Sequence, residues 1–163
     1  GFFAMKHNKK TNACRKLDEL KIDYRIVEYA VDEEHLDAVH VAAEVGMPAA
    51  QVFKTLVARG ASKTPYVFVI PVACELDLKK AAKAVGEKSV AMLPQKELLG
   101  LTGYVHGGCS PVGMKKPFPT VFHETAAQYD TVCVSAGRIG AQVECRPGDL
   151  IALLRAKTAD IIV

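Results

Sequence analysis

Lys54 is the first residue of chemical interest, because it lies in the middle of a stretch that reads as a buried β-strand. In QVFKTLVARG, residues 51–60, the side chains alternate between two faces, and both faces are apolar apart from Lys54 and Thr55. A buried ammonium group without a partner is costly, so such a lysine finds a carboxylate, shifts its pKa or faces a cavity. A lysine at a strand edge that extends to water is the alternative. Spacing alone leaves both open.

The second feature is a glycine-rich segment, HGGCSPVG, at residues 106–113. Gly107, Gly108 and Gly113 allow positive φ angles and close backbone approach, so amide groups could converge there on an anion or a carbonyl oxygen. Pro111 removes one N–H donor and stiffens the segment. It is not a phosphate-binding P-loop, because no G-K-[ST] sequence follows. A plain connecting loop is the other interpretation.

The remaining reactive residues form no conventional catalytic or metal-binding set. The five histidines are scattered, and none has metal-ligand spacing with a cysteine or a carboxylate. Ser110 could serve as a nucleophile only if His106 or His123 lay beside it, which the sequence does not show. Cys109 is either a reactive thiol or a small filling residue. No metal and no cofactor is therefore expected.

Composition indicates one globular domain. The chain has 163 residues, of which 50% are hydrophobic and 24% charged, and a length of this order buries a sizeable core. The five cysteines contain no C-x-x-C pair, which favours a reducing, cytoplasmic setting over a disulfide framework. No apolar run is long enough for a membrane helix. Residues 1–4 are expected to be a cloning remnant before Met5, and residues 5–163 the domain. The net charge of +3 permits an RNA partner without requiring one.

The pattern of elements predicts an α+β fold. Asp37 and Asp77 are expected to cap helices, and Gly46 to end one. Strands 51–60 and 66–73 are expected to form a hairpin across a short turn. The mixed order favours a single domain with a mixed or largely antiparallel sheet surrounded by helices, without regular βαβ winding. The expected helices are 12–21, 38–45, 78–86, 94–100 and 150–156, and the other strands are 22–30, 89–92, 120–124, 131–137 and 141–145.

Several segments together resemble the YbaK/EbsC family of aminoacyl-tRNA deacylases. VFKTLVARG, PVACELDLKKAAKAVGEKSVAM, TGYVHGGCSPVGMKKPFPT and VSAGRIGAQVE occur in the order and spacing of that family, over about residues 24–161. The pairing of LDLKK with GGxSPxGxKK is most similar to the YbaK branch, which acts on Cys-tRNA(Pro). The resemblance implies the fold of the prolyl-tRNA synthetase editing domain, with a barrel-like sheet.

The resemblance also implies a site. Lys54 matches the functionally essential lysine of the family, and Tyr29 matches an active-site tyrosine. The family often has an aromatic residue near Leu36, which this chain lacks, and some members carry an acidic residue where Gln142 stands. Besides Lys54 as the catalytic residue, the expected substrate-binding residues are Tyr29, Thr55, Gly107, Gly108, Ser110, Pro111 and Gln142.

The activity that the resemblance implies is removal of cysteine from mischarged tRNA(Pro), without a metal, and in partnership with prolyl-tRNA synthetase. The substrate's own thiol would attack the ester, and the cysteinyl group would leave as a thiolactone. Lys54 would hold the aminoacyl-adenosine end. Deacylation of Ala-tRNA(Pro) and a non-catalytic binding module are the alternatives. Five lysines either form one phosphate-facing patch or lie on two separate surfaces; they are Lys79, Lys80, Lys83, Lys115 and Lys116.

Overall fold

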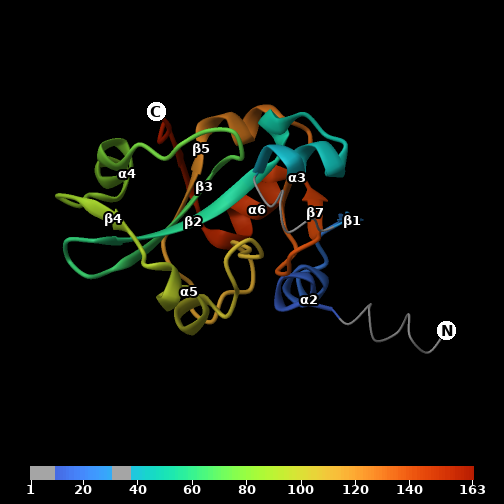
Figure 1. Ribbon diagram of the computed structural model, residues 1–163, viewed down its shortest axis with the longest axis horizontal. Helices are drawn as coiled ribbons and strands as arrows, with labels where there is room; N and C mark the ends of the chain where they lie inside the picture. The colour runs from blue at the N-terminus through green and yellow to red at the C-terminus, as the bar shows by residue number, and fades with distance from the viewer. Residues whose placement is uncertain (1–9, 31–37) are drawn as a thin grey trace.

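The computed structural model describes residues 10–30 and 38–163 (Figure 1), and helix α4 shows how local chemistry sets the ends of a helix. Helix α4 begins after Asp77, whose carboxylate accepts the N–H groups of Lys79 and Lys80 at 3.0 Å each. It ends at Gly86, with φ of 73°. The expected cap at Asp37 lies outside the described residues. The helices are α2 (Asn12–Glu19), α3 (Ala38–Val45), α4 (Leu78–Val85), α5 (Gln95–Thr102) and α6 (Pro147–Leu154), with 3-10 turns η2 (Ala49–Gln51) and η3 (Glu124–Gln128).

The strands form two sheets. A five-stranded sheet has the order β4-β2-β3-β5-β8, in which β2 pairs antiparallel with β3 and β4, whereas β5 pairs parallel with β3 and β8. A three-stranded antiparallel sheet has the order β1-β7-β6. The strands are β1 (Tyr24–Glu28), β2 (Phe53–Gly60), β3 (Pro65–Pro71), β4 (Val90–Met92), β5 (Thr120–His123), β6 (Val132–Ser135), β7 (Ala141–Cys145) and β8 (Lys157–Ala159).

This architecture confirms a single α+β domain with mixed and antiparallel sheets and surrounding helices. Neither sheet closes into a barrel in the described part of the chain. The expected hairpin of β2 and β3 is present, with Lys54 opposite Ile70. Two differences concern the C-terminal region. The last helix begins earlier than expected, with Pro147 in its first turn, and β8 was not predicted.

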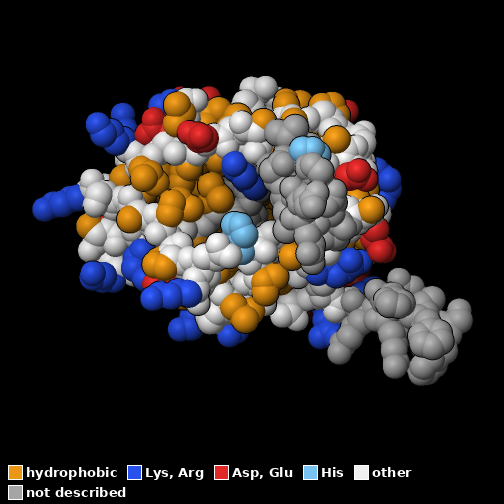
Figure 2. Space-filling view, viewed as in Figure 1, with side chains coloured by type: hydrophobic (Ala, Val, Ile, Leu, Met, Phe, Trp, Pro, Cys, Tyr) orange, Lys and Arg blue, Asp and Glu red, His pale blue; other side chains and the backbone are white. Residues whose placement is uncertain are grey.

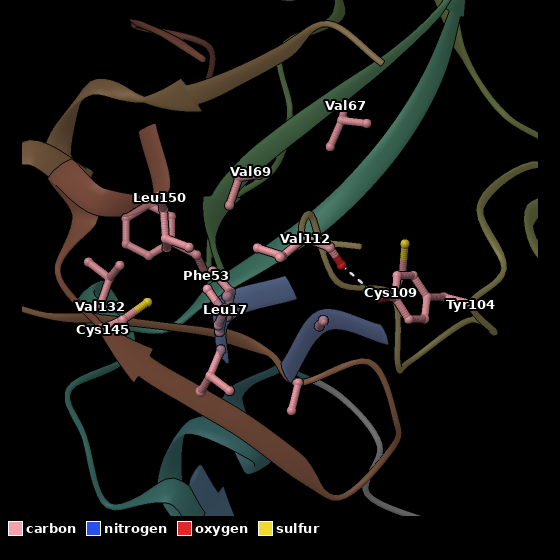
Figure 3. Close-up of a cluster of buried hydrophobic side chains, with 14 of the residues drawn as sticks. Leu17, Phe53, Val67, Val69, Tyr104, Cys109, Val112, Val132, Cys145 and Leu150 are labelled. Carbon is pink, nitrogen blue, oxygen red and sulfur yellow. Dashed lines mark hydrogen bonds between the residues drawn. The ribbon is translucent and has the colours of Figure 1, made fainter. Parts of the chain in front are cut away.

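The main hydrophobic core lies between the two sheets and helices α2 and α6. Leu17, Phe53 and Leu150 are among its fully buried side chains, and Figure 3 shows them converging from different elements. On one side of this cluster, Tyr104 donates a hydrogen bond of 2.6 Å to the carbonyl oxygen of Val112. That bond ties the glycine-rich segment to the core.

Strand β2 borders two clusters, since its side chains alternate. Phe53 and Val57 point into the main core, whereas Ala58 is buried in a second cluster beneath α4. Lys54 and Leu56 share the face of Ala58 but are only half-buried. On this face of β2, side chains are therefore less buried near Lys54 than near Ala58.

The outer edge of β2 changes partner along its length. Strand β4 pairs with Ala58–Gly60, and the carbonyl of Val57 accepts the N–H of Leu93 at 3.0 Å. At the other end, Val52 forms a parallel bridge with Cys133 of β6. No described strand pairs with residues 53–56 on this edge. A gap thus opens between β4 and β6.

Gly113 sets how closely the glycine-rich segment approaches α2. Its φ is +77°, and an added Cβ would lie 2.8 Å from Ala13 N, Asn12 C and Tyr104 Oη. Gly86 has a similar φ of +73°, but nothing lies within 4 Å of its Cβ position. A side chain at Gly86 would therefore meet only the cost of the positive φ, whereas a side chain at Gly113 would also clash with neighbouring atoms.

We expect Gly86→Ala to lower the free energy of unfolding by about 1–2 kcal/mol, the cost of the left-handed conformation. Gly113→Ala should lose about 1–3 kcal/mol more, since the new methyl group meets backbone atoms. Urea denaturation followed by circular dichroism measures both. Equal losses would contradict the tight approach of the segment to α2.

Candidate active site

The gap along β2 opens into a cavity of about 350 Å³. Its wall combines strand β2, the end of β1, strands β6 and β7, helices α3 and α5, and the glycine-rich segment. The lining residues are Tyr29, Val41, Phe53, Lys54, Thr55, Leu56, Val72, Leu98, His106, Gly107, Cys109, Ser135 and Gln142.

Lys54 brings a positive charge to the wall of this cavity. Its side chain makes no ion pair or hydrogen bond with any described residue. Figure 2 shows most Lys and Arg side chains spread around the margin of this face, while hydrophobic side chains gather left of its centre. An isolated ammonium group in a half-buried setting favours an oxygen-rich or anionic ligand. This resolves the two interpretations of Lys54 in favour of a residue that lines a cavity.

Two acceptor atoms on the same wall also lack partners. Three side-chain polar atoms of the described residues are buried without a hydrogen bond, and two of them, Thr55 Oγ1 and Gln142 Oε1, belong to cavity residues. Gln142 lies in the middle strand of its sheet, opposite Val27 on one side and Ser135 on the other, and is 6% exposed. A buried oxygen without a donor costs about 1–3 kcal/mol. Donors of a bound ligand would remove this cost.

The backbone of β2 adds further polar groups. The carbonyl of Val57 points outward to Leu93, and alternation gives Thr55, two residues away, the same direction. Thr55 thus presents its N–H and C=O at the unpaired edge. In the glycine-rich segment, the N–H of Gly108 already donates to Val105 O at 3.0 Å. The N–H groups of Gly107 and Cys109 have no acceptor among the described residues, so both are available to a ligand.

Five of the eight predicted site residues come together around the cavity: Tyr29, Lys54, Thr55, Gly107 and Gln142.

The other three predicted residues do not line it. A Cβ on Gly108 would lie 2.9 Å from Ile139 N, so this glycine allows contact with the turn before β7. Ser110 is fully buried and its Oγ accepts the N–H of Val112 at 3.2 Å. Pro111 lines a different groove. The structure gives these three residues roles in shaping the segment.

Cys109 lines the cavity but is not poised as a nucleophile. Burial raises the pKa of its thiol to about 11, although a hydrogen bond with Thr102 opposes this shift. It makes no hydrogen bond with His106, the histidine on the same wall. Among residues 10–30 and 38–163, no group of three or more His, Cys, Asp or Glu side chains could hold a metal ion.

Sequence reasoning did not find several lining residues. Leu98 on α5 and Val41 on α3 are ordinary apolar helix residues whose placement depends on long-range packing. Ser135 lies opposite Gln142 in the paired strands, a register that no local pattern specifies. Leu36, near which the family often has an aromatic residue, lies outside the described residues.

No helix in the described part of the chain is long and apolar enough to cross a membrane.

Comparison with known proteins identifies the family of the chain. Residues 32–153 match the family model of the aminoacyl-tRNA editing domain. A protein of Enterococcus faecalis (strain ATCC 700802 / V583), provisionally named Cys-tRNA(Pro)/Cys-tRNA(Cys) deacylase EbsC, is 47% identical over 156 residues, which cover 96% of this chain and 95% of that protein. The chain belongs to the aminoacyl-tRNA editing domain family.

Solved structures share the fold. A protein described provisionally as a trans-editing enzyme for prolyl tRNA synthetase superposes with a TM-score of 0.83 at 29% identity, covering 96% of this chain and 99% of that one. A hypothetical protein superposes with a TM-score of 0.85 at 22% identity, covering 94% and 100% of the two chains. The second likeness concerns the fold alone.

The unpartnered acceptor predicts an unusual stability effect. Thr55→Val removes a buried hydroxyl without a partner, so we expect the free energy of unfolding to stay unchanged or rise by about 1 kcal/mol. Thr102→Val is the matched control, because Thr102 Oγ1 donates to Leu98 O at 2.8 Å and accepts from Tyr104 N at 3.1 Å. It should lose about 1–3 kcal/mol. Urea denaturation of both variants tests this, and equal destabilisation would contradict a vacant acceptor at Thr55.

The raised pKa of Cys109 predicts slow alkylation at neutral pH. Because burial favours the neutral thiol, Cys109 keeps its proton until the pH approaches about 11. At pH 8 only about one thiol in a thousand is then ionised. Cys74 is the one cysteine that is not buried. Iodoacetamide at pH 8, followed by mass spectrometry, should modify Cys74 and leave Cys109 intact; equal labelling of the two would refute the assignment.

Proposed function

We propose that the protein is a deacylase that removes cysteine from mischarged tRNA(Pro), with the aminoacyl-adenosine end held in the cavity beside Lys54. One observation carries the proposal: the cavity joins the ammonium group of Lys54, which pairs with no described residue, to the vacant acceptors of Thr55 and Gln142. An aminoacyl ester offers the complementary groups, since its carbonyl and ribose oxygens accept hydrogen bonds and its α-ammonium group donates them. The names of the similar proteins support this substrate class.

The proposed chemistry uses the thiol of the substrate. That thiol attacks its own ester carbonyl, the bond between the carbonyl carbon and the ribose oxygen breaks, and the thiol proton ends on the ribose hydroxyl. The cysteinyl group leaves as a thiolactone. Attack within one molecule gains several kcal/mol from orientation alone, so it needs no strong protein nucleophile. This fits a wall whose cysteine is held neutral by burial.

The roles of the residues follow from their chemistry. Lys54 would hold the ester or a phosphate oxygen by charge-assisted hydrogen bonds. The N–H groups of Gly107 and Cys109 are available to the oxyanion that develops at the carbonyl. Tyr29 would close the side of the cavity at the end of β1, where its backbone N–H donates to Gly140 O at 3.0 Å. Gln142 and Thr55 would accept from the α-ammonium group and the ribose.

A role in trans also belongs to the proposal. The protein would act in the cytoplasm on tRNA released by prolyl-tRNA synthetase. That synthetase attaches cysteine to tRNA(Pro) by mistake, because cysteine and proline differ little in size. The solved structure described as a trans-editing enzyme for that synthetase supports this partner.

The decisive experiment measures release of radiolabelled amino acid from Cys-tRNA(Pro), Ala-tRNA(Pro) and Pro-tRNA(Pro). We expect rapid release of cysteine alone, and a loss of at least about 100-fold in kcat/KM for Lys54→Ala. Lys79→Ala, an exposed lysine on α4, is the matched control and should retain full activity.

Three outcomes would contradict the proposal in different ways. Release of alanine would exclude the substrate thiol as the attacking group, because alanine has none. Full activity of Lys54→Ala would remove this lysine from the site. Binding of a cysteinyl-adenosine analogue without cleavage of any ester would leave a non-catalytic binding module.

A further inference from the structure

A second groove lies on the other side of the glycine-rich segment. It has a volume of about 560 Å³ and runs between α2, residues 111–120 and the end of α6. Cys109 lines the first cavity and Pro111 lines this groove, and only the buried Ser110 separates them. Their Cα atoms are therefore no more than about 8 Å apart. The two hollows share one thin wall.

The rim of the groove is cationic. Arg15, Lys16, Lys116 and Arg155 line it, against a single carboxylate, Glu19. Lys16 forms an ion pair with Glu19 at 4.0 Å, so the carboxylate of Glu19 already has a partner.

The other three cations, Arg15, Lys116 and Arg155, are exposed, and their side chains make no ion pair or hydrogen bond with a described residue. The groove thus holds three positive charges that no group in the described part of the chain neutralises.

The floor of the groove is apolar. Val112 is fully buried, and Met114 and Phe118 are half-buried and packed against the main core. A positively charged rim over a floor with an aromatic side chain is the combination that binds nucleic acid strands, with phosphates at the rim and a base against the ring. The volume lies within the range of small-ligand pockets, roughly 300–1,000 Å³, so a nucleotide unit fits.

Two of the lysines that the sequence singled out are engaged elsewhere. Lys80 is held by Asp160 and by the carbonyl of Ile162, both at 2.9 Å. Lys115, next to the groove residue Lys116, donates to Gly100 O at 3.1 Å. Lys116, by contrast, lines the groove together with Arg15 and Arg155.

We propose that this groove binds the acceptor-arm RNA of the same aminoacyl-tRNA whose 3′ end occupies the first cavity, with Arg15, Lys116 and Arg155 on its phosphates. The proposal rests on the proposed function for the identity of the RNA. An RNA strand is favoured over an acidic peptide because of the aromatic floor and because the groove adjoins the cavity across one loop.

The test is binding of an uncharged RNA hairpin with the tRNA(Pro) acceptor-arm sequence and a CCA end, measured by fluorescence anisotropy. With three phosphate contacts, affinity should fall about 40-fold between 50 and 200 mM salt. In the double variant Arg15→Ala, Lys116→Ala, one contact remains, so the fall should be only about 3–4-fold. Its affinity at 50 mM should also be at least about tenfold lower.

The matched control is Lys79→Ala, Lys88→Ala, which removes two exposed lysines outside the groove and should bind as the wild type does. Deacylation gives a second readout: KM of the groove variant for Cys-tRNA(Pro) should rise about tenfold with kcat retained. Cleavage of cysteinyl-adenosine, which lacks the RNA strand, should not change.

Each remaining outcome overturns one proposal only. Wild-type affinity and salt dependence in the groove variant would overturn RNA binding at the groove, whatever the activity. If the groove variant lost binding to prolyl-tRNA synthetase but still bound RNA as the wild type does, RNA binding at the groove would also be overturned. The groove would then be a protein-docking surface. Salt-dependent RNA binding without cleavage of any ester would refute the deacylase and leave the groove as proposed.

Discussion

The outer edge of β2 has no single partner along its length, and the candidate site exists for that reason. Strand β4 covers one end of this edge, and just before the other end Val52 bridges to Cys133 of β6. Buried backbone groups need hydrogen-bond partners, so an unpaired stretch of strand must face water, a side chain or a ligand. Here it faces a cavity, and Thr55 and Lys54 lie on the unpaired stretch. The two sheets hold this stretch open because each is anchored in the same core.

The cavity supplies donors and acceptors rather than an activated nucleophile. Its ammonium group, loop amides and vacant oxygens can hold an ester in place, whereas burial keeps the thiol of Cys109 protonated at neutral pH. Such a wall suits a reaction in which the attacking group arrives with the substrate, because the protein then contributes orientation and electrostatic stabilisation. The absence of a catalytic pair among the described residues is thus consistent with an enzyme.

Much of this arrangement could be predicted from the sequence, where local signals were strong. The alternation of side chains in residues 51–60 predicted a buried strand and showed that Lys54 is unusual in it. Asp77 and Gly86 predicted the two ends of α4. Residues whose role depends on distant packing were harder. The conformational freedom and small size of glycine suggested that Gly108 faces a ligand, but the segment uses that residue to approach the turn before β7. Ser110 is likewise turned inward to Val112.

The missed elements have a similar cause. Strand β8 is three residues long and pairs in parallel with β5, which no short-range pattern specifies. The second groove joins side chains of α2, α6 and the segment after the glycines, so its residues are far apart in the sequence. In each case the information lies in the tertiary arrangement.

The pairing of β1 with β7 has a consequence for how the chain acquires its structure. Tyr24 lies opposite Cys145, so about 120 residues separate the two partners. Strands that pair across such a distance form slowly, because a long loop must close before the contact is gained. During synthesis from the N-terminus, β1 would wait unpaired until nearly the whole domain had been made. The wall that carries Gln142 is therefore completed late, and an incomplete chain would have the hairpin of Lys54 but not the opposite side of the cavity.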